Sequence, residues 1–254
     1  MIPDANFEQA LINQGYDSGT VNGSVYTSLI NTITHLDISN PLNNQIITDL
    51  TGIEDFTALI SLHCGNNQLT TLDVSNNTAL TELDCSTVAW LTGTLTSLDV
   101  SQNTALTYLN CRHNWLTNLD VSNNTALTEL WCQENQLTTL DLSNNTALTW
   151  LMCHENQLTT LDVSGATALT DLWCHSNQLT SLDVSNNIAL DKLQCGDNQL
   201  TSLDVSNNIV LTSLLCEENQ LINLDVSQNT ALNLLRSEEH TSELQSRSDL
   251  VCRL

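Results

Sequence analysis

The sequence predicts a solenoid, in which short turns of chain stack side by side, and three observations support this. Eight of the nine cysteines recur every 21 residues, with one interval of 26. A repeat period of about 20–29 residues is typical of stacked units. Each unit also has two stretches in which apolar and polar residues alternate, as in strands with one buried face. Ser, Asn and Thr, which favour turns, follow the second stretch. The regularly spaced cysteines are Cys64, Cys85, Cys111, Cys132, Cys153, Cys174, Cys195 and Cys216.

A typical unit runs from Leu127 to Ala147 and reads LTELWCQENQLTTLDLSNNTA. Its opening, L-x-x-L-x-C-x-x-N-x-L, resembles the leucine-rich repeat signature, with Cys at the third apolar position. The resemblance implies an α/β-type right-handed superhelix, mostly β-structure and turns, whose parallel sheet forms a concave face. We expect a strand around Leu130 and Cys132 and a second extended stretch, 140–142, on the opposite wall.

The repeats divide the chain into three parts. Residues 1–32 do not repeat, and we expect a helical N-terminal cap there, with Asp4 as N-cap and Gly15 near the helix end. Residues 33–235 are the leucine-rich repeats: an irregular first repeat over 33–58, eight full units over 59–231 and a truncated ninth. The unit that begins at Leu80 has a five-residue insertion that contains Trp90.

Two further resemblances indicate the kind of repeat protein. ITDLTGIEDFTAL, residues 47–59, resembles the internalin-type repeat of bacterial surface proteins. IPDANFEQALI and the units LDVSNNTALT and C-x-x-NQLT resemble repeat proteins of Bacteroidetes and flavobacteria. These resemblances imply an exported protein that is secreted or displayed on the cell surface. Met1 is followed directly by Ile-Pro-Asp, so we recognise no signal peptide.

Residues 236–254 share nothing with the repeat. The first eleven, RSEEHTSELQS, resemble the translation of a common sequencing-library adapter. We therefore expect residues 236–254 to be a non-native tail and leave them out of functional reasoning. On this interpretation the solenoid is truncated after Leu235, and its last core layer is expected to be exposed.

The charge balance excludes several classes of partner. The chain has 5 Lys+Arg against 29 Asp+Glu, a formal net charge of −24. Nucleic acids and anionic membrane surfaces require cationic patches, so we expect neither as a partner. No run of about 18 apolar residues is present, so we expect no membrane insertion. Basic partners and divalent cations remain open.

Three columns of identical residues are expected to be mainly structural. The cysteine column, which includes Cys132, Cys153 and Cys174, is expected to pack as small buried hydrophobic groups. The asparagine column resembles the family's ladder of inward amides; its members include Asn114, Asn135, Asn156 and Asn177. The aspartate column is expected to cap the following turns, and the alternative is a row of Ca²⁺ ligands. The candidate Ca²⁺ ligands are Asp120, Asp141, Asp162 and Asp183.

The units differ from one another mainly at outward strand positions and at the two positions that follow the cysteine. The middle units place an aromatic group there, and these residue types are enriched at recognition sites. The group consists of Tyr108, Trp131, Trp150, Met152 and Trp173, with His154, His175 and Arg112 beside it. We expect this group to be exposed and to bind a protein or a glycan. The alternative is sequence drift on an exposed sheet. Replacing the three tryptophans with Ala is expected to leave folding nearly intact.

We expect no catalysis, cofactor or metal site. His154-Glu155 suggests a metal contact or an acid/base pair, and three histidines occur in nearby units. However, His113 lies one position later in its unit than His154 and His175, and no nucleophile elbow or phosphate loop is present. The sequence thus favours a non-catalytic binding module for protein recognition or adhesion. The alternative is a carbohydrate-binding or structural surface repeat, with Ca²⁺ as a candidate stabilising ion. The oligomeric state remains open.

Overall fold

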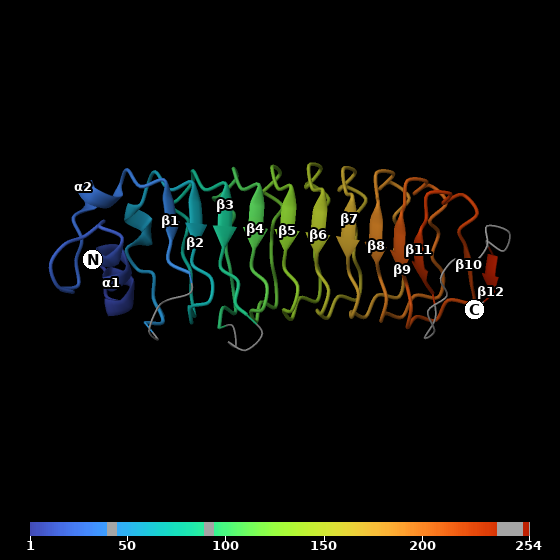
Figure 1. The fold of residues 1–254 in the computed structure, drawn as a ribbon, viewed down its shortest axis with the longest axis horizontal. Helices are drawn as coiled ribbons and strands as arrows, with labels where there is room; N and C mark the ends of the chain where they lie inside the picture. Colours follow the sequence, from blue (N-terminus) through green and yellow to red (C-terminus); the bar gives the residue numbers. More distant parts are fainter. Residues whose placement is uncertain (40–44, 89–93, 238–250, 254) are drawn as a thin grey trace.

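The computed structural model describes residues 1–39, 45–88, 94–237 and 251–253 and shows an elongated stack of turns (Figure 1). One parallel sheet of 10 strands runs along the whole stack, in the order β1 to β9 and then β11. Its strands are β1 (His35–Asp37), β2 (Ser61–His63), β3 (Glu82–Asp84), β4 (Tyr108–Asn110), β5 (Glu129–Trp131), β6 (Trp150–Met152), β7 (Asp171–Trp173), β8 (Lys192–Gln194), β9 (Ser213–Leu215) and β11 (Leu234–Arg236). The predicted parallel-strand solenoid is confirmed.

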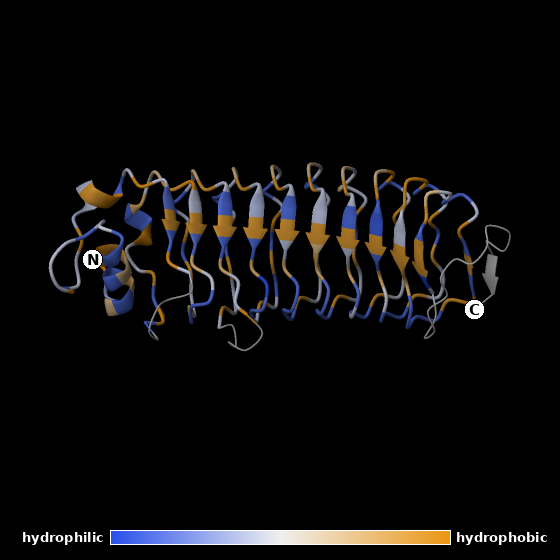
Figure 2. Ribbon diagram, viewed as in Figure 1, coloured by the Kyte–Doolittle hydropathy of each residue, from blue (hydrophilic) through white to orange (hydrophobic). Residues whose placement is uncertain are grey.

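The strands form where the repeat places one leucine between two variable residues. The central leucine of each strand points into the core, and Leu130 and Leu151 are fully buried. Neighbouring strands align in strict register, so Leu130 pairs with Leu151 and Trp131 with Met152. Figure 2 shows the resulting hydrophobic band, which crosses the strands from β1 to β11. Each central leucine therefore buries its side chain against its counterparts in the adjacent turns, which contributes about 1.5–3 kcal/mol per leucine before the entropy of ordering the chain is subtracted.

The side of the solenoid opposite the sheet, here called the return wall, is formed by the second extended stretch of each turn, such as residues 140–142. It has no helix among the described residues that follow Asp55. Leu140 and Leu142 are buried while Asp141 between them is exposed, as the alternation predicted. The Asp141 carboxylate accepts a hydrogen bond from the Ser143 amide at 2.9 Å, and the other aspartates of this column make the equivalent bond. The predicted capping of each following turn is confirmed.

The predicted asparagine ladder links consecutive turns. The Asn135 amide group donates to the carbonyl of Cys111 in the preceding turn and to that of Cys132 in its own turn, both at 3.1 Å. Its carbonyl oxygen accepts the backbone N–H of Leu116 at 3.0 Å. A buried amide is stable only when it is hydrogen-bonded in this way. The ladder thus holds the turns together along the stack.

A second asparagine ladder, which the sequence analysis missed, lies at the turns of the return wall. Asn145 is fully buried and donates to the carbonyls of Val121 at 3.1 Å and Asn124 at 3.0 Å. Equivalent bonds come from Asn77, Asn103, Asn124, Asn187, Asn208 and Asn229. In one turn Ala166 occupies this position, and the preceding Gly165 lies very close to the Ser143 backbone. The ladder therefore misses one rung there.

The N-terminal segment contains α1 (Ala5–Asn13) and α2 (Thr27–Ile30), followed by a short 3₁₀ helix, η2 (Ile53–Asp55). Asp4 is the N-cap of α1, and its carboxylate accepts the amides of Asn6 and Phe7. The helix buries Phe7, whose ring lies 6.3 Å from that of Phe56. Gly15 follows the helix with a φ of +79°, a conformation that favours glycine. The capping pattern thus places α1 where the sequence predicted it.

The second residue after every regularly spaced cysteine except Cys85 breaks the alternation of the strand. In the described turns these residues have φ values between 49° and 59°, in the left-handed region. They are Asn66, His113, Glu134, Glu155, Ser176, Asp197 and Glu218. None is glycine, although side chains other than those of Gly, Asn and Asp are strained there. This conformation redirects the chain out of the strand and toward the ladder asparagine.

The C-terminal end differs from the expectation of an exposed core layer. Leu224, Val226 and Leu235 are all at most 2% exposed. β11 continues to Arg236, one residue beyond the predicted end of the repeats, and pairs with β9. A further strand, β12 (Val251–Arg253), pairs antiparallel with β10 (Asn223–Asp225) on the return wall. The expectation of an exposed last layer was therefore wrong, because chain beyond Leu235 lies alongside the last turns. Residues 238–250 and 254 of the expected tail, and Trp90, lie outside the described residues.

Candidate functional site: the sheet face

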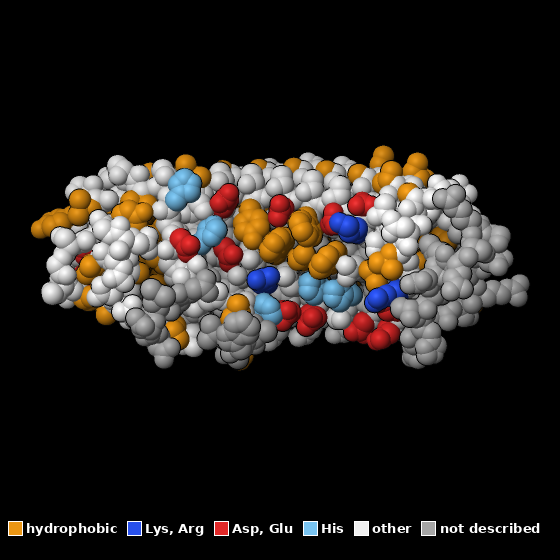
Figure 3. Space-filling model, viewed as in Figure 1, with side chains coloured by type: hydrophobic (Ala, Val, Ile, Leu, Met, Phe, Trp, Pro, Cys, Tyr) orange, Lys and Arg blue, Asp and Glu red, His pale blue; other side chains and the backbone are white. Residues whose placement is uncertain are grey.

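The aromatic patch predicted from the sequence forms one continuous surface. It consists of Tyr108, Trp131, Trp150, Met152 and Trp173, which come from strands β4 to β7. Figure 3 shows these hydrophobic side chains in the middle of the sheet face, with histidines along one margin and acidic side chains beyond them. The parallel register brings them together because it places equivalent positions of adjacent turns side by side.

The rings pack edge to face instead of lying flat. Tyr108 and Trp131 have ring centroids 5.5 Å apart and planes at 71°, and Trp131 and Trp150 have centroids 5.6 Å apart and planes at 62°. Such geometry is favourable for aromatic pairs. The patch therefore presents a ridged surface, and these neighbouring rings do not form a coplanar platform.

The patch is less exposed than the sequence analysis expected. Met152 is only 8% exposed, and the four aromatic side chains are half-buried against one another. The indole N–H groups of Trp131, Trp150 and Trp173 are covered and have no hydrogen-bond partner. The expectation of a fully exposed group was wrong because each large side chain covers part of the next. Replacing all three tryptophans with Ala would consequently remove packing as well as a contact surface.

Charged groups border the patch at both ends. The Arg112 guanidinium lies 6.0 Å from the centroid of the Trp131 ring, within cation–π range. Lys192 forms an ion pair with Asp171 at 3.1 Å. Burial, together with the nearby Asp84 carboxylate, raises the pKa of the Tyr108 hydroxyl to about 12. Tyr108 therefore stays neutral at physiological pH.

The histidines form the margin of the patch. His154 and His175 occupy equivalent positions in adjacent turns and stack with centroids 4.3 Å apart and planes at 13°. Burial lowers the pKa of His154 to about 4, and the neighbouring His175 and His113 add to this shift. Burial also lowers the pKa of His175. Both rings are therefore expected to be neutral at pH 7, and the Nδ1 atom of each is covered without a hydrogen-bond partner.

His113 has a different partner from the other two histidines. Its Nδ1 lies 2.5 Å from a carboxylate oxygen of Glu134 in the next turn. Glu155, one turn further along, instead lies beside His154 and His175: one ligand atom from each of these three residues lies within 4.8 Å of the others. The sequence analysis named His154-Glu155 as a metal contact or acid/base pair but set it aside because of the offset of His113, and so did not group these two residues with His175.

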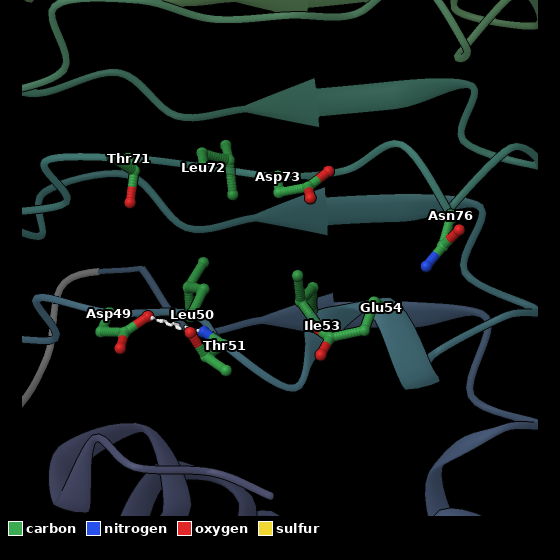
Figure 4. Close-up of a pocket in the computed structure, with 9 residues that line it drawn as sticks. All are labelled: Asp49, Leu50, Thr51, Ile53, Glu54, Thr71, Leu72, Asp73 and Asn76. Carbon is green, nitrogen blue, oxygen red and sulfur yellow. Dashed lines mark hydrogen bonds between the residues drawn. The ribbon is translucent and has the colours of Figure 1, made fainter.

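The candidate calcium ligands lie on the return wall, away from the patch. Asp141, Asp162 and Asp183 line a shallow groove there. A smaller pocket near the N-terminal end is lined by Asp49, Glu54 and Asp73, whose side chains are spread over neighbouring turns (Figure 4). Their carboxylates accept hydrogen bonds from backbone N–H groups of their own turns. For example, Asp49 accepts the N–H of Thr51, and Asp73 accepts the N–H of Ser75. Capping thus already accounts for the positions of these carboxylates, and a role in binding Ca²⁺ stays a prediction.

The eight regularly spaced cysteines are buried, as predicted. Burial raises the pKa of the thiols from Cys64 to Cys195, to about 12 for Cys132 and Cys174. A thiol that stays protonated is neither a good nucleophile nor a metal ligand. The cysteine column is therefore part of the core.

Comparison with known proteins places the fold among leucine-rich repeat solenoids. The functional domain of InlJ from Listeria monocytogenes, described as including a cysteine ladder, is 35% identical with a TM-score of 0.61; the match covers 95% of this chain and 62% of that domain. A leucine-rich repeat protein of Leptospira interrogans is 28% identical with a TM-score of 0.65, over 73% of this chain and 51% of that one. The chain therefore spans less than two thirds of the length of either protein.

Internalin C2 from Listeria monocytogenes has a TM-score of 0.58 at 23% identity, over 92% of both chains, and supports the fold alone. The LVIVD repeat family matches residues 64–86, about one turn of the stack. No curated protein sequence matches the chain. Within the described ranges, no helix has the length and apolar character needed to cross a bilayer. The chain thus has an internalin-like leucine-rich repeat fold.

Proposed function

We propose that the chain is a non-catalytic recognition module that binds a protein partner through the aromatic patch. The observation that carries the proposal is the patch itself: five large side chains on four consecutive strands in the middle of the sheet face, of which the four aromatic ones are half-exposed. Trp, Tyr and Met are the residue types that most often dominate binding energy at interfaces. The similarity to the InlJ domain supports a role in protein binding. A location outside the cell or on its surface is part of the same proposal.

The ring geometry favours a protein over a glycan. Stacking against a sugar requires an exposed, flat ring face, whereas the Tyr108–Trp131 and Trp131–Trp150 pairs stand at 71° and 62°. A ridged apolar surface is instead complementary to the side chains of a protein. The formal charge of −24 favours a partner that places basic groups around an apolar centre.

The proposal can be tested with a variant that uses residues already found at the same positions of other turns. Trp131→Gln and Trp173→Gln introduce the residue present at position 194, and Trp150→Glu introduces the one at position 129. The triple variant and a control, Trp115→Ala, would be compared with the unmodified chain on a protein array and a glycan array. Trp115 is 52% exposed and lies outside the patch.

We expect the unmodified chain and the Trp115→Ala variant to retain the same protein ligands, and the triple variant to lose them with its circular dichroism unchanged. Removing a central aromatic contact typically costs about 2 kcal/mol or more of binding free energy. Ligands that the triple variant retains would contradict the proposal, as would the absence of any ligand. Patch-dependent binding to glycans alone would establish carbohydrate recognition instead.

A further inference from the structure

We propose that His154, His175 and Glu155 form a binding site for a divalent transition-metal ion of the Zn²⁺ class, at the margin of the aromatic patch. Among the described residues, these three are a group of potential ligands with one ligand atom each within 4.8 Å of the others. The proposal concerns the metal alone and does not depend on the identity of a protein partner. It departs from the sequence analysis, which expected no metal site.

The distances are compatible with coordination. Zn²⁺ binds imidazole nitrogen at about 2.0–2.1 Å and carboxylate oxygen at about 2.0–2.2 Å, so two ligand atoms on a tetrahedral ion lie roughly 3.3 Å apart. The three ligand atoms are already within 4.8 Å of one another without an ion. Small side-chain rotations can close the difference, since the two histidine rings lie stacked on the protein surface and are only half-buried.

The backbone beneath the site fixes the spacing of its ligands. The Cys153 amide donates to the Trp173 carbonyl at 2.9 Å, and the Glu155 amide donates to the His175 carbonyl at 3.1 Å. These bonds hold the two turns in register on both sides of His154. The site is therefore built on the same rigid framework as the sheet, which favours a preorganised ligand set.

The positive φ of Glu155 explains why its side chain joins the histidines. Consecutive residues of a strand point to opposite faces, which would direct residue 155 away from His154. A φ of 53° at Glu155 breaks this alternation. Consequently a carboxylate oxygen from one turn lies beside imidazole rings from that turn and the next.

Competing partners do not occupy the histidines. The Nδ1 atoms of His154 and His175 have no hydrogen-bond partner, whereas Nδ1 of His113 lies next to Glu134. The carboxylates of Glu155, Glu217 and Asp197 also act on His175 electrostatically, so the surroundings favour a cation. Two neutral imidazoles and one carboxylate match the ligand set of many zinc sites that keep a fourth position open.

The test is a titration of the full chain with a zinc salt at neutral pH, followed by calorimetry and by the NMR resonances of the histidine rings. The variants are His154→Gln, His175→Gln and Glu155→Gln. Gln133 already occupies the position of His154 in the preceding turn, so these substitutions suit the fold. The matched control is His63→Gln, which removes a histidine on the same sheet face that lies 3.9 Å from Glu82. A second control, His113→Gln, disrupts the pair with Glu134.

We expect one ion to bind the unmodified chain and both controls, with shifts of the His154 and His175 resonances. Each histidine variant should weaken zinc binding by at least about 10- to 100-fold, because this is the loss observed when a residue that merely supports a metal ligand is removed. Zinc binding that survives in the His154→Gln/His175→Gln double variant would overturn the proposal, and so would a chain that binds no zinc. Loss of zinc binding in the His113→Gln variant would indicate that the ion binds at the His113–Glu134 pair, and would contradict the assignment.

Discussion

Asn144 and Asn145 are neighbours in the sequence but have different structural roles. Asn145 is fully buried, and its amide group satisfies two carbonyls of the preceding turn. Asn144 is exposed and makes one bond, to the Ser122 carbonyl at 3.3 Å. The same residue type therefore contributes to the core at one position and to the solvated surface at the next.

Asn145→Ala is expected to lower the free energy of unfolding by about 1–3 kcal/mol, because it removes two buried hydrogen bonds between adjacent turns. Asn144→Ala is the matched control and should change stability by no more than about 0.5 kcal/mol. Both values can be measured by urea denaturation followed by circular dichroism. Equal effects of the two substitutions would show that the second ladder does not stabilise the stack. Ala166 indicates that the fold accepts one such gap.

At the scale of the structural element, the bend after most strands contains a residue with positive φ, and some of these residues have side chains that are strained in this conformation. Glu218 is exposed and has a φ of 54°. Asn adopts this conformation more readily than Glu, and Asn66 already occupies the equivalent position.

We expect Glu218→Asn to stabilise the chain by about 0.5–1 kcal/mol, since the folded conformation becomes less strained. Glu217→Asn, one residue earlier and outside the set with positive φ, is the control and should have a smaller effect. Thermal denaturation of the two variants and the unmodified chain provides the comparison. A destabilised Glu218→Asn variant would contradict the explanation by backbone strain.

The elements also show how far the sequence alone could go. Leu130 and Cys132 identified a strand because the two-residue period determines which face is buried. The same period assigned Met152 to the outer face but could not show that neighbouring rings cover it. Asn145 was missed because Ser-Asn-Asn-Thr is typical of a turn in any protein. The approach of Glu155 to His175 depends on the positive φ of Glu155. The sequence could not predict this angle, because glutamate has no preference for positive φ.

At the scale of the whole molecule, the aspartate column makes stability depend on pH. Hydrogen bonds from the serine two residues further on, through its hydroxyl and its amide, lower the pKa of most of these carboxyls, including Asp120, Asp162 and Asp183. A carboxyl whose pKa is lower in the folded state than in the unfolded state stabilises the fold when it is ionised. This contribution is complete above the unfolded pKa of about 3.9 and is lost as the pH falls through the lower folded values.

The thermal midpoint should therefore be nearly constant above about pH 5 and fall steeply below about pH 4. The double variant Ser122→Ala/Ser164→Ala removes two hydroxyl donors but keeps the backbone donors, so its midpoint should depend less on pH in this range. Differential scanning calorimetry at several pH values measures both curves. An identical acid dependence in the variant would show that other carboxyls dominate.

The two asparagine ladders and the sheet share one further property. Each ladder and the sheet contribute bonds that connect one turn to the next, so these bonds run along the length of the stack. If the chain is pulled by its two ends, these bonds are loaded one after another rather than together. Turns should then detach singly from an end, and each 21-residue turn would release roughly 70 Å of extended chain. Under force, the molecule should therefore unfold in a series of separate steps, and the length of chain released in each step is set by the repeat length.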